Sequence, residues 1–167
     1  MTPEMAHSVA ARARALRTSL APSADPVAAA IAARRLFEDA GDEVRVRWLN
    51  LELHGYEPAM TAAGPLTQVL RVPPHDRLAA HVAAYRTQRA TRHGSPELVH
   101  FFVEALPELV AARQQASAAV GTELELSFGP DPGSSEYPTT ATFPRNVFDR
   151  VLEGFLAALH LQLGTLG

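Results

Sequence analysis

Residues 25–57 read DPVAAAIAARRLFEDAGDEVRVRWLNLELHGYE. The residues in this stretch that typically start and end helices predict at least one helix. Asp25 before Pro26 is typical of a helix start, because the carboxylate accepts from the first backbone N–H groups and proline suits the first turn. Gly41 follows the last apolar position, and glycine readily adopts the left-handed conformation that ends a helix. The sequence therefore predicts a helix from Pro26 to about Ala40.

The following stretch, residues 42–55, fits two templates. Val44, Val46 and Trp48 alternate with polar residues, and a period of two indicates a strand. A helix would place Val44, Trp48 and Leu51 on one side, and it is favoured by the acidic start and by the glycine at the end. The pattern alone leaves both interpretations open.

Apolar spacing predicts further helices on both sides of this stretch. The stretch at residues 4–19 has an apolar stripe with arginines on its other side. Proline inside the pattern at Pro107 predicts a kink or a break, because proline removes a helical hydrogen bond. The remaining predicted helices are residues 75–92, 96–105, 107–119 and 144–163.

Strand patterns are few. Residues 122–128 alternate apolar and polar side chains, which indicates a half-buried strand. A short apolar piece at residues 66–72 is the candidate for its partner. At 167 residues, the chain suits one domain. We therefore expect a single domain over residues 1–167, mainly α, built as a compact bundle of about five to six helices with a small two-stranded β-element.

Composition excludes several classes of chemistry. The chain has no cysteine, which excludes disulfides, thiolate nucleophiles and cysteine-based zinc sites. All 15 basic residues are arginine, which excludes a Schiff-base lysine and a phosphate-binding loop with its lysine. No run approaches the roughly 18 apolar residues that cross a bilayer. We expect a cytoplasmic protein with no cofactor and no membrane contact.

Charge is distributed in alternating blocks. Residues 1–35 carry a net charge of +3, residues 36–58 of −4, residues 71–92 of +4 and residues 97–136 of −6, and the whole chain sums to −3. Blocks of opposite sign can pair within one fold or between subunits. Both arrangements stay open at this point, and the second would make the protein an oligomer.

Five arginines are candidates for binding nucleic acid or a partner. Three of them recur at every third residue along the predicted helix 75–92, and such a stripe can follow a phosphate backbone. The alternative is a solvated helix face whose charges pair with nearby acids. The negative total charge argues against a strong electrostatic grip on nucleic acid. The five residues are Arg71, Arg77, Arg86, Arg89 and Arg92.

The evidence for a metal or catalytic site is weak. His100 and Glu104 are four residues apart, but one such pair supplies two ligands and a catalytic metal site needs at least three. Asp76 follows His75 and is expected to cap a helix. An enzyme built on these four residues remains only a distant alternative, and we expect no metal and no catalytic residues.

Residues 30–57 resemble the start of the AbiTii domain, a bacterial abortive-infection module. Members show a helix of small and aliphatic residues, a Gly/Asp break, a tryptophan and a Glu-Leu-x-Gly-Tyr close. This chain has Trp48 and then Glu52, Leu53, His54, Gly55 and Tyr56. Members often continue with Pro-x-Tyr-Arg, from which this chain departs.

The resemblance implies that residues 42–55 form a helix. It also implies anti-phage defence and a role in recognition or assembly, without agreed catalytic residues. We expect the motif itself to be structural, with Trp48, Leu51 and Tyr56 buried against Ile31, Leu36 and Phe37. The expected function is a non-enzymatic module that binds a protein partner or itself, and the alternative is a nucleic-acid sensor.

Overall fold

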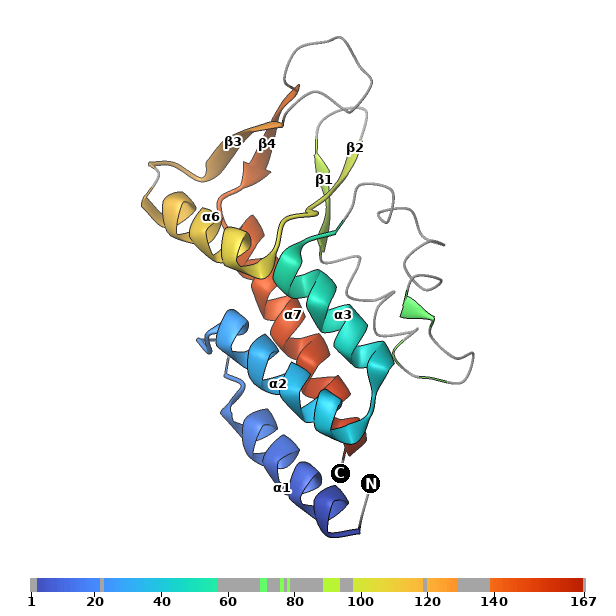
Figure 1. Cartoon of the computed structure of the whole chain (residues 1–167). Coiled ribbons are helices and arrows are strands. Elements are labelled where there is room, and N and C mark those ends of the chain that lie inside the picture. Colours follow the sequence, from blue (N-terminus) through green and yellow to red (C-terminus); the bar gives the residue numbers. More distant parts are fainter. Residues whose placement is uncertain are drawn as a thin grey trace.

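The computed structural model describes residues 3–21, 23–56, 70–71, 76, 78, 89–93, 98–118, 120–128 and 139–166. Over these residues the fold is mainly α, with five α-helices and two antiparallel two-stranded sheets (Figure 1). The helices are α1 (Pro3–Ser19), α2 (Pro26–Ala40), α3 (Glu43–His54), α6 (Leu106–Ala118) and α7 (Val147–Leu163), followed by the short 3-10 helix η2 (Gly164–Leu166).

Helices α2 and α3 begin and end at the residues that cap them. The Asp25 carboxylate accepts from the backbone N–H groups of Val27 and Ala28, and Gly41 adopts a left-handed conformation at φ 73°. Asp42 caps α3 by accepting from the Arg45 N–H at 3.1 Å. The predicted helix at Pro26–Ala40 is therefore confirmed, and residues 43–54 are helical, as the family resemblance implies.

The core is organised around α7. This helix buries 11 of its residues and packs against α1, α2 and α6. Its Phe155 ring lies 5.9 Å from the ring of Trp48 on α3. Helix α1 lies on the outer side of α2 (Figure 1), where Val9 and Ala13 of its apolar stripe are buried and Met5 is exposed.

The strand predicted at residues 122–128 is confirmed, but its partner is not the predicted one. Strand β3 (Glu123–Phe128) pairs antiparallel with β4 (Thr139–Pro144). Most of residues 66–72 lie outside the described residues, and Leu70 is helical. The next segment in the chain is the better partner, because its threonines suit the pleat and alternate with buried Ala141 and Phe143.

A second hairpin lies where the sequence predicted helices. Strand β1 (Ala90–His93) pairs antiparallel with β2 (Leu98–Phe101), so the predicted helix at residues 96–105 is wrong. A short apolar run does not distinguish a strand from a buried helix by its period. The predicted helix 75–92 is also wrong at its end, and most of it lies outside the described residues. The predicted helix 107–119 is confirmed as α6, with Pro107 in its first turn.

Gly55 has the closest neighbours of the four glycines for which the structure shows the space around an added Cβ. It ends α3 at φ 91° and ψ 167°, a region open almost only to glycine. A Cβ there would lie 3.1 Å from the Val103 carbonyl oxygen, whereas a Cβ at Gly41 would meet no atom within 4 Å. The α3 terminus and the chain after β2 thus approach each other through a glycine.

We expect Gly55→Ala to lower the free energy of unfolding by about 2–4 kcal/mol, because backbone strain adds to the close approach. Gly41→Ala is the matched control and should cost about 1–2 kcal/mol, the cost of a left-handed alanine alone. Urea unfolding of both variants measures the difference. Equal losses would show that the contact with Val103 does not constrain this position.

Candidate functional site

Three motif residues form one buried polar cluster. Glu52 on α3 is fully buried, and its carboxylate accepts from the Trp48 indole N–H at 3.0 Å and from the Tyr56 hydroxyl. The spacing of four residues places the three side chains on the same side of α3 and its C-terminal end. Trp48 and Tyr56 are themselves buried in the core.

Arg89 completes this cluster from a distant part of the chain. Its guanidinium donates to the other Glu52 oxygen at 2.7 Å and to the backbone carbonyls of Phe102 at 2.5 Å and Glu104 at 3.0 Å. It also lies 4.7 Å from the centre of the Tyr56 ring, a cation–π geometry. The buried charge of Glu52 is thereby compensated, and α3 is tied to the segments that precede β1 and follow β2.

The expectation for the five arginines needs correction at Arg89. This side chain is fully buried, so it cannot belong to an exposed stripe that binds nucleic acid or a partner. The reason is electrostatic, since a buried carboxylate requires a buried cation. Arg71 is exposed, Arg92 contributes its backbone to β1, and the two others, Arg77 and Arg86, lie outside the described residues.

The rest of the motif serves the fold. Leu53 is half-buried against the core, and the Gly55 N–H donates to the Leu51 carbonyl at the end of α3. The expected packing of the motif against α2 is corrected at one position, because the Ile31 side chain is 37% exposed. Leu36 and Phe37 belong to the buried core as expected.

Arg45 organises a second cluster that the sequence did not indicate. It is 5% exposed and donates to Asp42 at 2.7 Å, to Gln162 on α7 at 2.9 Å and to both carboxylate oxygens of Asp76 at 2.8 and 3.1 Å. Asp76 also accepts from the Leu78 N–H, as a capping residue does. No local signal could have found this cluster, because Gln162 lies 117 residues from Arg45 in the sequence.

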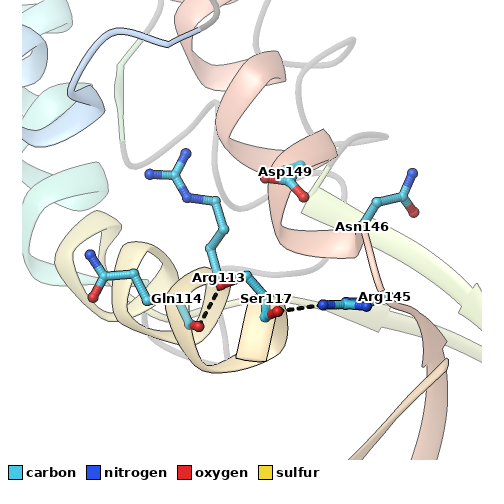
Figure 2. A pocket seen from close by; sticks show the side chains of 6 residues that line it. All are labelled: Arg113, Gln114, Ser117, Arg145, Asn146 and Asp149. Carbon is cyan, nitrogen blue, oxygen red and sulfur yellow. Dashed lines mark hydrogen bonds between the residues drawn. The ribbon is translucent and has the colours of Figure 1, made fainter. Parts of the chain in front are cut away.

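A pocket of about 440 Å³ lies between α6 and the start of α7 (Figure 2). Arg145 follows β4 and donates to the carbonyls of Ala116 at 3.2 Å, Gly121 at 3.4 Å and Ser117. Two of these carbonyl groups, those of Ala116 and Ser117, belong to the last turn of α6, and the C-terminal end of a helix attracts cations. The lining residues are Arg113, Gln114, Ser117, Arg145, Asn146 and Asp149.

The chemistry of this pocket is that of an anion acceptor. Arg113 is half-buried and extends away from α6 in Figure 2, and within the described residues it forms no ion pair. The Asn146 side chain does not cap α7. Two arginines against Asp149 give the lining a net charge of +1. The site leaves no signal in the sequence, because Arg113 stands alone in an acidic block.

Some charges of the first block pair with charges of the second block inside the fold. Arg12 on α1 pairs with Asp39 on α2 at 2.8 Å, and Arg34 pairs with Glu38 within α2 at 3.5 Å. The buried pair of Arg89 with Glu52 joins the third block to the second. The intramolecular interpretation thus accounts for these acids.

Neither a membrane-spanning helix nor a metal site occurs among the residues that the structure describes. No helix among them is long and apolar enough to span a bilayer, and no group of three or more His, Asp or Glu side chains is arranged to hold a metal ion. Of the four residues considered for an enzyme site, His75 and the His100 side chain lie outside the described part.

Comparison of the chain with protein-family models, with curated proteins and with solved structures found no match. The AbiTii resemblance therefore rests on the residues of the motif.

We expect Glu52→Gln and Arg89→Met each to lower the free energy of unfolding by about 3–5 kcal/mol, because each leaves its partner charged, buried and uncompensated. The double variant should lose less than the sum of the two, since neither charge remains. Urea unfolding followed by the fluorescence of Trp48, the single tryptophan, completes the cycle. Strictly additive losses would argue against the ion pair.

Trp48→Ala should unfold the domain, since removing a buried tryptophan costs about 3–5 kcal/mol. Trp48→Phe should lower the free energy of unfolding less, because it keeps an aromatic ring against Phe155 and loses only the hydrogen bond to Glu52 and part of the ring. Circular dichroism during thermal unfolding distinguishes the two variants. A well-folded Trp48→Ala protein that had lost only a binding activity would contradict the structural role of the motif.

Proposed function

We propose that this chain is a non-enzymatic protein-interaction or self-assembly module of a bacterial abortive-infection system, acting in the cytoplasm. The AbiTii resemblance supplies the biological context. The observation that carries the proposal is the closed cluster of Glu52, Arg89, Trp48 and Tyr56. The polar groups of the motif form hydrogen bonds with one another in the core, so the motif stabilises the fold. A partner would therefore bind to side chains on the surface.

The surface offers groups suited to binding a protein. The pocket between α6 and α7 presents Arg113 and Asn146 beside an open volume. The neighbouring hairpin presents the exposed acids Glu123 and Glu125. Charged groups arranged in this way favour selective association with a complementary surface.

The proposal competes with nucleic-acid sensing through arginine-rich faces, and the structure weakens this alternative because it removes Arg89 from the surface. The two functions predict different particles in solution. An assembly module forms a discrete protein oligomer, whereas a sensor carries nucleic acid whose binding falls steeply with salt.

Size-exclusion chromatography with light scattering, at about 50 and 500 mM salt and with absorbance at 260 and 280 nm, tests the proposal. We expect an oligomer of defined mass, free of nucleic acid, that dissociates at the higher salt. A monomer that elutes with nucleic acid at low salt would instead favour the sensor. A clean monomer at both salts would contradict self-assembly.

A further inference from the structure

We propose that the corner formed by the α6–α7 pocket and the β3–β4 hairpin is a self-complementary docking surface for a second copy of this chain. In this arrangement Glu123 and Glu125 of each copy meet Arg113 and Arg145 of the other. The inference deepens the self-assembly part of the proposed function and rests on it.

The basic half of the surface has hydrogen-bond donors to spare. Arg113 lines the pocket without an ion pair among the described residues. Arg145 uses three of the five N–H groups of a guanidinium on the carbonyls at the end of α6. Asn146 adds an amide that does not cap α7. Carboxylate oxygens are the complementary ligands, since arginine binds them with paired hydrogen bonds.

The acidic half is the outer face of the hairpin. Along β3, Leu124 and Leu126 belong to the core while Glu123 and Glu125 are exposed. The register places Glu125 opposite the exposed Thr142 on β4, so no cation faces it across the hairpin. Within the described residues neither glutamate takes part in an ion pair.

The two halves adjoin each other. The Arg145 N–H donates to the Thr122 carbonyl at 2.9 Å, and Glu123 pairs with Pro144 in the register of the hairpin. Glu123 is therefore a neighbour of Arg145, yet the Arg145 guanidinium is turned to the α6 carbonyls and forms no ion pair with it. The fold itself keeps the acids and the arginines of this corner apart.

Adjacent patches of opposite charge favour a two-fold dimer. In such an interface the same patch faces itself, so an acidic half of one copy meets the basic half of the other twice. Several other described charges are paired inside the chain, as Arg12 with Asp39 and Arg89 with Glu52 show. At this corner both signs remain unpaired side by side, which favours a second copy over an unrelated partner.

A charge-exchange experiment tests the proposal. Sedimentation velocity over a concentration series gives the dimer dissociation constant of the wild type, of Arg113→Glu and of the double variant Glu123→Arg/Glu125→Arg. We expect each variant to weaken the dimer on the order of 100-fold, because like charges then face each other twice across the two-fold axis. Mixing the two variants should restore a dimer, since both contacts of the mixed pair join opposite charges, and this recovery would also show that both proteins fold.

Arg14→Glu is the matched control. It makes the same charge change at an exposed residue of α1, away from the corner, and should leave the dissociation constant within about twofold of the wild type. An equal loss in this control would trace the effect to total charge and would overturn the docking surface.

The remaining outcomes separate this inference from the proposed function. An oligomer that is insensitive to both charge reversals would overturn the docking surface and leave self-assembly standing. A wild-type monomer would overturn both the docking surface and the self-assembly part of the proposed function. A wild-type monomer that binds a labelled glutamate-rich peptide through Arg113 would overturn the second copy as occupant and point to an acidic partner protein.

Discussion

The buried ion pair of Glu52 and Arg89 is the constraint on which the rest of the fold depends. A carboxylate inside the core is tolerated only when a cation and hydrogen-bond donors surround it, and Arg89, Trp48 and Tyr56 meet this requirement. Because Arg89 also donates to the carbonyls of Phe102 and Glu104, the same group fixes the β1–β2 hairpin against α3. With α3 fixed in this way, the ring of Trp48 on α3 packs against Phe155 on α7.

Polar groups buried in this manner specify one arrangement of elements. An apolar core could accept α3 in several rotations, whereas Glu52 has its donors in only one of them. Arg45 has the same effect at the opposite end of α3, where it joins Asp42, Asp76 and Gln162. Helix α3 is therefore held at both ends by arginine, and the surface beyond it remains available for recognition.

Under the proposed function, recognition uses groups that the core does not need. Arg145 illustrates the division, since its guanidinium stabilises the end of α6 and still forms one wall of the pocket. Arg113 and the outer glutamates of β3 make no comparable contribution to the fold within the described residues. Charge at this corner can thus serve association at little cost to stability.

The sequence by itself determined the elements whose signals are local. Asp25, Pro26 and Gly41 define α2 because caps act within a few residues, the alternation over residues 123–128 defines β3, and the Trp-Glu-Tyr spacing marks the motif. Tertiary structure decided what long-range pairing controls. Whether Arg89 is a surface cation or the partner of Glu52, and whether β3 pairs with residues 139–144, depends on which segments meet in space. The free energy of a buried charge depends on which groups surround it in the folded chain, and no sequence pattern within one helix or strand predicts those groups.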